Sequence, residues 1–202
     1  MNHTLQIPRL VISSKILGRM SEEEFIHFTQ EQRDLRIERN ENNEIEIIAP
    51  AFSETGRINA EIIRQLSNWN VKTKLGFVFD SSAGFRIDPD KEVVRSPDAA
   101  YISRERYEAL STVDKKHFIP LCPDFVIELR SHSDSLIRLQ EKMERYITYG
   151  AILGWLFDPE NETVYIYRTD GSRDVHKGYS GKLSAGDVLP GFALELEMLK
   201  VE

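Results

Sequence analysis

A carboxylate inside an apolar segment is the first feature of this sequence with chemical meaning. Glu128 interrupts residues 125–129, which have the length and the two-residue alternation of a β-strand. Phe125, Ile127 and Leu129 share one face of this predicted strand, so Glu128 lies on the other face. A charge taken into an apolar interior costs several kcal/mol unless it is paired, hydrogen-bonded or bound to a metal ion. Glu128 therefore needs a partner.

Two Pro-Asp pairs offer candidate partners for Glu128. Asp124 lies on the same predicted strand at about 13 Å from Glu128, which is too far for the two carboxylates to share one ion. If the strand that begins at Asp98 neighbours this strand, Asp98 and Glu128 come within about 5 Å and can share a divalent cation. The alternative interpretation of Asp98 is a turn residue at the mouth of a strand. We expect Asp124 to be structural.

Two basic residues lie close to this pair in the sequence. Magnesium binds through one or two carboxylates and completes its shell with water and substrate phosphate. A basic side chain beside such an ion would complete a hydrolytic site. Lys142 is at the edge of the apolar stripe of a predicted helix, and Arg130 follows Glu128 by two residues. In the alternative interpretations, Lys142 is a surface residue whose stem packs on apolar neighbours, and Arg130 pairs with Glu128.

The elements that must position these residues follow from periodicity, caps and turns. A capping box at Ser21 and Glu24 begins the first helix, and a segment of strand, helix and strand at 124–157 predicts two parallel strands joined by a right-handed crossover. We predict helices at 22–32, 55–69, 104–110 and 135–149, and strands at 34–38, 44–48, 76–80, 84–87, 93–102, 124–129, 153–157 and 164–168.

Composition limits the class of protein. The chain has 202 residues, 41% of them hydrophobic, enough for one folded domain, in which we expect a core at 54–202 and an N-terminal helix and hairpin appendage at 1–53. A net charge of −7 excludes a protein that coats nucleic acid by bulk electrostatics. One cysteine and the absence of a long apolar segment indicate a cytoplasmic protein without a membrane span.

Four motifs in order resemble those of the PD-(D/E)xK nuclease superfamily. They are Ser96-Pro97-Asp98-Ala99, the segment 123–131 with Glu128 and Arg130, the helix with Lys142, Tyr146 and Gly150, and the segment 154–159. They are most similar to those of a bacterial branch of restriction-endonuclease-like proteins, over about residues 20 to 196. The resemblance implies an α/β (α+β) fold with a central mixed β-sheet flanked by helices.

The resemblance also implies site residues and a reaction. Asp98 and Glu128 would bind Mg²⁺ or Mn²⁺, with Glu61 as an additional acid from a helix, and the protein would be a metal-dependent endonuclease. We expect a nucleic-acid substrate, with DNA favoured over RNA, and a homodimer, because cutting both strands needs two sites. The third motif position is Arg130 where the superfamily usually has lysine; arginine does not give up its proton at neutral pH. Lys142, from the following helix, is the expected catalytic lysine.

Two other classes of protein stay open on the sequence. One is a catalytically weak or inactive nuclease-fold protein that binds nucleic acid or another protein. The other is a purely structural module in which Glu128 and Arg130 form a buried pair.

Overall fold

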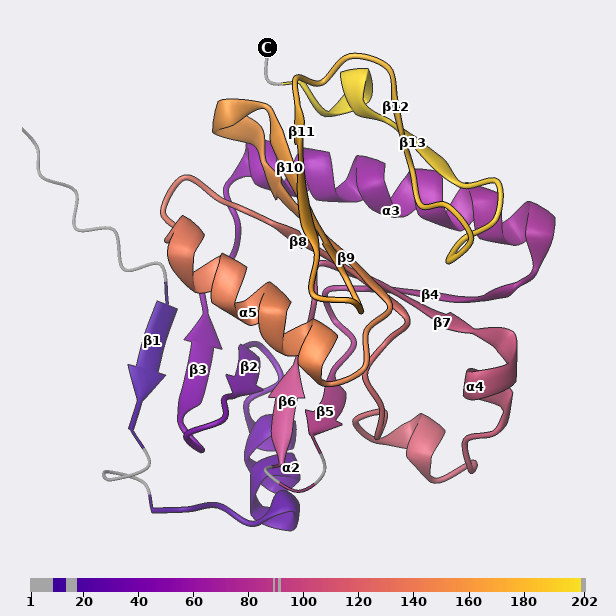
Figure 1. The fold of residues 1–202 in the computed structure, drawn as a ribbon. Helices are drawn as coiled ribbons and strands as arrows, with labels where there is room; N and C mark the ends of the chain where they lie inside the picture. The colour runs from indigo at the N-terminus through magenta and orange to yellow at the C-terminus, as the bar shows by residue number, and fades with distance from the viewer. Residues whose placement is uncertain (1–8, 14–17, 89, 91, 201–202) are drawn as a thin grey trace, which may run out of the picture.

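A mixed β-sheet runs through the middle of the molecule, with helices on both faces (Figure 1). In the computed structural model, residues 9–13, 18–88, 90 and 92–200 are described. The sheet has the strand order β11-β10-β9-β8-β7-β4. Its strands are β4 (Gly76–Asp80), β7 (Ala99–Ser103), β8 (Phe125–Leu129), β9 (Leu153–Asp158), β10 (Thr163–Arg168) and β11 (Arg173–Lys177).

The predicted crossover is present at the centre of this sheet. β8 and β9 pair in parallel and are joined by α5 (Leu136–Thr148), and all residues of both strands are buried. Burial of every residue is what a central strand covered on both faces requires. Glu128 therefore lies on a strand that is covered on both faces, and its side chain is in the interior.

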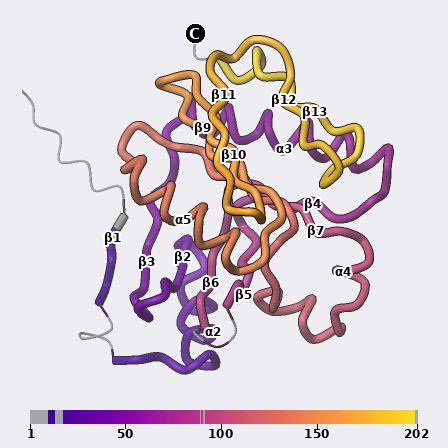
Figure 2. The backbone as a smooth tube through the Cα atoms, viewed as in Figure 1, coloured from indigo at the N-terminus to yellow at the C-terminus, as the bar shows by residue number. Residues whose placement is uncertain are grey.

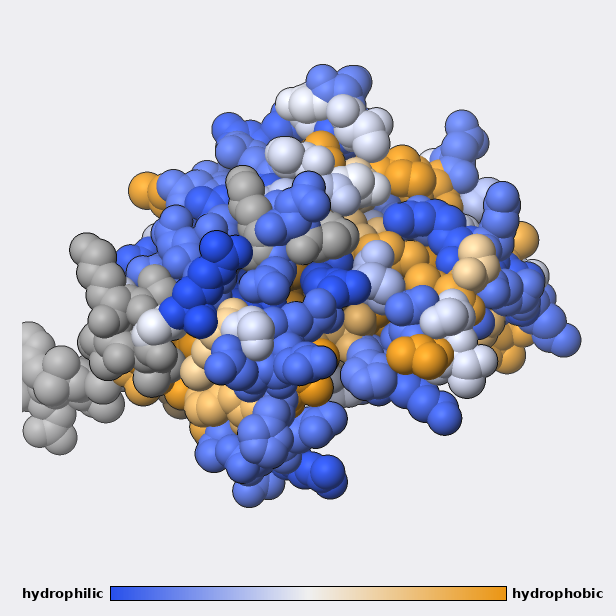
Figure 3. Space-filling model, turned by 90° about the horizontal axis from the view of Figure 1, so that it is seen from below, coloured by the Kyte–Doolittle hydropathy of each residue, from blue (hydrophilic) through white to orange (hydrophobic). Residues whose placement is uncertain are grey.

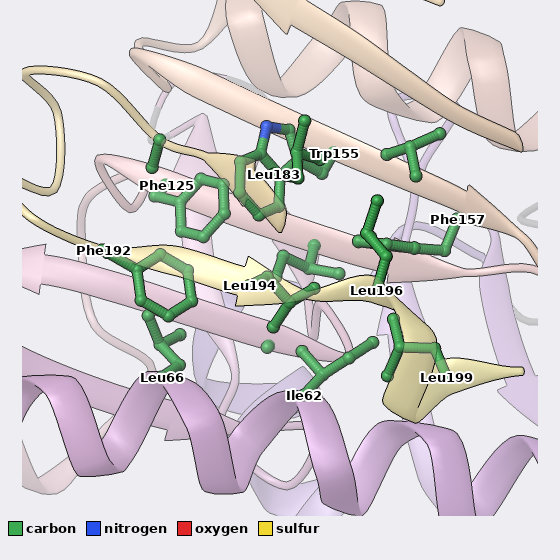
Figure 4. Close-up of a cluster of buried hydrophobic side chains, with 14 of the residues drawn as sticks. Ile62, Leu66, Phe125, Trp155, Phe157, Leu183, Phe192, Leu194, Leu196 and Leu199 are labelled. Atoms are coloured by element: carbon green, nitrogen blue, oxygen red, sulfur yellow. The ribbon is translucent and has the colours of Figure 1, made fainter. Parts of the chain in front are cut away.

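A long helix and the C-terminal segment cover one face of the sheet. α3 (Ser53–Thr73) lies along it, with β12 (Lys182–Ser184), β13 (Ala193–Glu195) and the 3₁₀ helix η3 (Leu196–Leu199) beside the helix, as the backbone trace also shows (Figure 2). Ile62 and Leu66 of α3 belong to the same apolar cluster as Phe125 and Trp155 of the central strands (Figure 4). This face is the larger apolar core of the molecule.

The opposite face of the sheet is covered by α5 and by a second sheet. The second sheet has the order β1-β3-β2-β6-β5, formed by β1 (Arg9–Ile12), β2 (Arg36–Arg39), β3 (Ile45–Ile48), β5 (Phe85–Asp88) and β6 (Val93–Arg95). α2 (Glu22–Glu31) packs beside it, and the capping box of Ser21 and Glu24 is confirmed. The remaining helical segments are α4 (Arg104–Glu108), η1 (Asp114–Lys116) and η2 (Pro159–Asn161).

The predicted strand 93–102 is wrong as one element. It is two strands in different sheets, β6 and β7, separated by Ser96-Pro97-Asp98. Pro97 has no backbone N–H and restricts Ser96, so the chain leaves one sheet there and enters the other. The N-terminal hairpin is also hydrogen-bonded to β6, so it shares a sheet with strands from the predicted core.

None of the helices described is both long and apolar enough to span a membrane.

Candidate functional site at the junction of the two sheets

Asp98 and Glu128 lie on neighbouring strands. β7 and β8 pair antiparallel with Ala99 opposite Ile127, and the same register continued by one residue puts Asp98 opposite Glu128. The Oδ2 atom of Asp98 accepts a hydrogen bond of 2.9 Å from the backbone N–H of Leu129. The prediction that these two strands are neighbours is confirmed, and Asp98 is fixed beside the end of β8.

Lys142 projects from α5 onto this pair of strands. Its Nζ atom is 2.9 Å from Oε1 of Glu128 and 3.2 Å from Oε1 of Glu38. One turn further along α5, the hydroxyl of Tyr146 donates a hydrogen bond of 2.9 Å to the same oxygen of Glu128. The side chain of Lys142 is only 13% exposed, so its interpretation as a surface residue is wrong.

Glu38 is a member of this site that the sequence analysis missed. It comes from β2 in the second sheet, and its carboxylate also accepts hydrogen bonds from Arg95 (3.1 Å) and from the backbone N–H of Ser96 (3.0 Å). A signal for it existed in the hairpin, where Glu38 lies directly opposite Glu46. Like charges opposite one another destabilise a strand pair, so such a pair predicts a cation between them. Arg95 is that cation, at 2.8 Å from Glu46.

The ionisation of these groups follows from burial and from their neighbours. Burial raises the pKa of Glu128 to about 7, and the Asp98 and Glu38 carboxylates add to the rise against the opposing effect of Lys142. Burial alone would raise the pKa of Glu38, but Lys142, Arg95 and Arg36 lower it to about 2. Burial alone would lower the pKa of Lys142, but the Glu128 and Glu38 carboxylates raise it. Lys142 is therefore a protonated cation at neutral pH.

Arg36 connects Asp98 to the solvent side of the site. Its Nη1 atom is 3.1 Å from Oδ1 of Asp98, and the Arg36 and Asp98 side chains are 28% and 18% exposed. The side chains of Glu38 and Glu128, by contrast, are almost fully buried. A ligand from solvent therefore meets the Asp98 side of the cluster before it meets Glu128.

Glu61 is not brought to this cluster. It lies on α3, which packs on the face of the central sheet opposite to α5. Its carboxylate pairs with Arg64 and accepts a hydrogen bond of 2.9 Å from Gln65, which in turn contacts the backbone of Glu195. These partners direct Glu61 towards the C-terminal segment.

Arg130 and Asp124 have structural partners. The Nη1 atom of Arg130 lies 3.0 Å from Oδ1 and 3.1 Å from Oδ2 of Asp158, so the suggested Glu128–Arg130 pair is not formed. Arg130 follows the last residue of β8, where the alternation of the strand no longer fixes its direction. Asp124 accepts a hydrogen bond of 2.6 Å from the N–H of Ser103 and pairs with Arg106, as expected for a structural role.

The donor set suits a hard divalent cation. Within the described part of the chain no group of three or more acidic, histidine or cysteine residues is arranged to hold a metal ion. Magnesium needs only one or two carboxylates and keeps several waters, so Asp98 and Glu128 meet its chemical requirement. Both carboxylates already contact a protein cation, Arg36 and Lys142 respectively, and a metal ion would share them with those cations.

Comparisons with known proteins agree with this architecture. No curated protein matches the chain. A crystal structure described as that of "a putative nuclease belonging to DUF820 from Anabaena variabilis ATCC 29413" is similar with a TM-score of 0.67 and 17% sequence identity, over 81% of this chain and 88% of that chain. This likeness confirms the predicted nuclease-like fold, a mixed sheet flanked by helices.

The family comparison covers most of the chain. The model of the Uma2 family, described as "Putative restriction endonuclease", matches residues 22–197. That range includes both sheets except β1, and it includes Glu38, Asp98, Glu128 and Lys142. The chain therefore belongs to the Uma2 family of restriction-endonuclease-like proteins.

Proposed function

We propose that the protein is a metal-dependent endonuclease that hydrolyses phosphodiester bonds of DNA. The description of its family names an endonuclease. The observation that carries the proposal is the contact of 2.9 Å between Lys142 and Glu128, made beside Asp98 where the two sheets meet. Two carboxylates are enough to hold one magnesium ion, and a protonated lysine beside them can stabilise negative charge that develops on a phosphate.

In this proposal Asp98 and Glu128 hold Mg²⁺ or Mn²⁺. The metal, when bound, polarises a phosphate oxygen and lowers the pKa of a bound water. Lys142 stays protonated because two carboxylates face it, so it stabilises negative charge that develops on the phosphate and does not act as a base. Tyr146 orients Glu128 through its hydrogen bond, and Glu38 holds Lys142 in position.

The proposal is tested by cleavage assays with isosteric variants. Asp98→Asn, Glu128→Gln and Lys142→Met are each expected to lower the rate of Mg²⁺-dependent cleavage of plasmid DNA by at least about 100-fold. Glu61→Gln is the matched control, since it removes a carboxylate that lies on the other face of the sheet, and it is expected to keep full activity. Full activity in the first three variants would overturn the site assignment.

A second candidate function is a nuclease-fold protein that binds nucleic acid or a protein without cutting. It is favoured by the ion pairs that already neutralise Asp98 and Glu128, and by Arg130 at the usual lysine position. The two candidates differ in magnesium binding. An enzyme with this site is stabilised by Mg²⁺, and the rise in Tm disappears in Asp98→Asn, whereas the binding module shows no rise in either protein.

The proposal includes a homodimer if the substrate is duplex DNA. One chain carries one candidate site, and cutting both strands of a duplex in one encounter needs two. Analytical ultracentrifugation should then show a dimer, and plasmid cleavage should give linear product without accumulation of the nicked form. A monomer that only nicks would remove this part of the proposal.

A further inference from the structure

A large cavity opens next to the Asp98 side of the candidate site. Its volume is about 810 Å³, within the range of ligand sites, and it is formed by five separate segments of the chain. Arg36 and Ser96 belong to both the cavity wall and the candidate site, because Arg36 pairs with Asp98 and the N–H of Ser96 donates to Glu38. The other walls come from α2, from the turn between β4 and β5, from α4 and from residues 115–119.

The cavity is basic although the whole chain is acidic. Four Lys and Arg residues line it against one acidic residue, Asp34, in a chain with a net charge of −7. Besides Arg36, the cationic lining residues are Arg33, Lys115 and Lys116. Arg33 and Lys115 donate to the backbone carbonyls of Gln30 (3.2 Å) and Glu108 (3.4 Å), which are neutral acceptors. Their positive charges are thus available to an anionic ligand.

Aromatic side chains line the same cavity. Phe79 and Tyr107 pack against each other with ring centroids 5.8 Å apart, and the Nζ atom of Lys115 lies 5.1 Å from the centre of the Tyr107 ring. Phe118 forms another part of the wall and is supported by Phe25 from behind, at 5.7 Å between centroids. All three lining aromatics are partly exposed. Aromatic rings beside cations are the usual binding surface for unpaired bases and their phosphates.

One face of the molecule mixes hydrophilic and hydrophobic residues. Figure 3 shows this face from below, the side on which Figure 1 places α2. Most residues of this face are hydrophilic, and hydrophobic residues are visible between them.

We propose that this cavity binds a single-stranded segment of nucleic acid and delivers its backbone to Asp98. The inference rests on the proposed function and names an unpaired segment of the substrate strand as what the cavity recognises. Phosphates contact Arg33, Lys115 and Lys116, and bases stack on the partly exposed rings of the wall. A duplex keeps its bases stacked on one another and hides their faces, so it gains nothing from aromatic walls, whereas an unpaired strand uses both the charges and the rings.

Binding is measured by fluorescence anisotropy of labelled oligonucleotides in EDTA, so that no cleavage occurs. A single strand is expected to bind at least about tenfold more tightly than a blunt duplex of the same length. An abasic strand of equal length and charge is expected to bind at least about tenfold more weakly than the normal strand, because it cannot stack. Equal binding of the duplex and the single strand, or of the abasic and the normal strand, would overturn the proposal.

Variants of the chain locate the binding site. Arg33→Ala with Lys116→Ala removes two exposed cations from the cavity, and is expected to weaken single-strand binding and to lower the slope of log affinity against log salt by about 1.4, at about 0.7 per phosphate contact. Lys72→Ala with Lys200→Ala is the matched control, because both lysines are exposed and neither lines the cavity. The same slope in both double variants would place the binding elsewhere and overturn the proposal.

Failure of this inference is distinct from failure of the proposed function. If the protein cuts duplex DNA with dependence on Glu128 but does not bind single strands, the cavity proposal fails and the nuclease proposal stands. If single strands bind through Arg33 and Lys116 but no nucleic acid is cut, single-strand binding by the cavity stands, and the nuclease proposal fails together with delivery of the strand to Asp98.

Discussion

Lys142 lies between two buried carboxylates, Glu128 on the central sheet and Glu38 on the second sheet. Each of these acids would be uncompensated in the interior without a cation, and their combined charge keeps the lysine protonated in spite of its burial. The side chain of Arg130, which follows the strand, turns towards Asp158. A helix therefore supplies the cation that the strand lacks.

Removal of Lys142 should destabilise the protein. Lys142→Met leaves Glu128 and Glu38 with one cation fewer, and breaking a buried ion pair in this way costs about 3–5 kcal/mol. Urea denaturation followed by circular dichroism measures the loss. The double variant Lys142→Met with Glu128→Gln is expected to recover part of the lost stability, because one of the unpaired charges is gone. Additive losses in the double variant would show that the two side chains do not interact.

Magnesium binding to the proposed site should strengthen as the pH rises. Only ionised Glu128 binds the metal, and its pKa is raised to about 7, so each pH unit below that value weakens binding by up to about tenfold. The carboxyl is protonated at about pH 5 and ionised at about pH 8, so the gain in Tm on adding Mg²⁺ is larger at the higher pH. Glu128→Gln has no such group, and its response to Mg²⁺ should not depend on pH in this range; a dependence that survives in this variant would assign the titration to another residue.

At the scale of elements, the pairing of β4, β7 and β8 holds Asp98 beside Glu128. β4 is the edge strand and pairs with β7, with Gly76 opposite Ser103 and Asp80 opposite Ala99. This pairing holds β7, the strand that follows Asp98, in place. Gly76 allows this close approach. A Cβ atom there would meet the backbone oxygen of Ile102 at 2.2 Å and the ring of Tyr101 at 2.6 Å.

Two glycine substitutions should have opposite effects on stability. Gly76→Ala places a methyl group against backbone that cannot move aside, so we expect a loss of at least about 1–3 kcal/mol. Gly56→Ala is the control in α3, where a Cβ atom meets nothing within 4 Å. Alanine is the better helix former, so we expect a gain of about 0.5–1 kcal/mol. Chemical denaturation of the two variants decides this, and equal effects would mean that the close approach at Gly76 is relieved by small shifts.

At the scale of the whole molecule, the two sheets meet through charged side chains as well as through apolar ones. Glu38, Arg36 and Arg95 come from the second sheet, and Asp98 and Glu128 from the strands of the central sheet or their ends. The apolar cluster of α3 and the C-terminal strands lies on the far face and contributes no group to the site. Integrity of the site thus depends on how the sheets dock.

Cys122 gives a measure of that integrity. It is the single cysteine of the chain, it is buried, and burial raises the pKa of its thiol to about 12. Its thiolate fraction at about pH 8 is then about 10⁻⁴ in the folded protein, so alkylation by iodoacetamide is expected only after unfolding. Labelling and circular dichroism should give the same urea midpoint if the molecule unfolds as one unit. Labelling at lower urea would reveal local opening around the loop before β8.

The sequence by itself determined the local elements and the strand that carries Glu128. Alternation, helical spacing and caps depend on near neighbours, and they predicted α2, α3, α5 and the parallel pair β8–β9 within a few residues at their ends. The ordered motifs also gave the family, which the match over residues 22–197 shows. Asp98 was predicted as a neighbour of Glu128 because strands have a fixed spacing.

Only the tertiary structure decided which distant groups meet. Glu38 reaches Lys142 across 104 positions of sequence, and Arg130 turns to Asp158, because docking of the second sheet and the exit of the chain from β8 fix those directions. Glu61 faces the C-terminal segment because α3 packs on the opposite face from α5. A period of two or of 3.6 residues tells which side chains share a face, but it does not tell which face of another element they will meet.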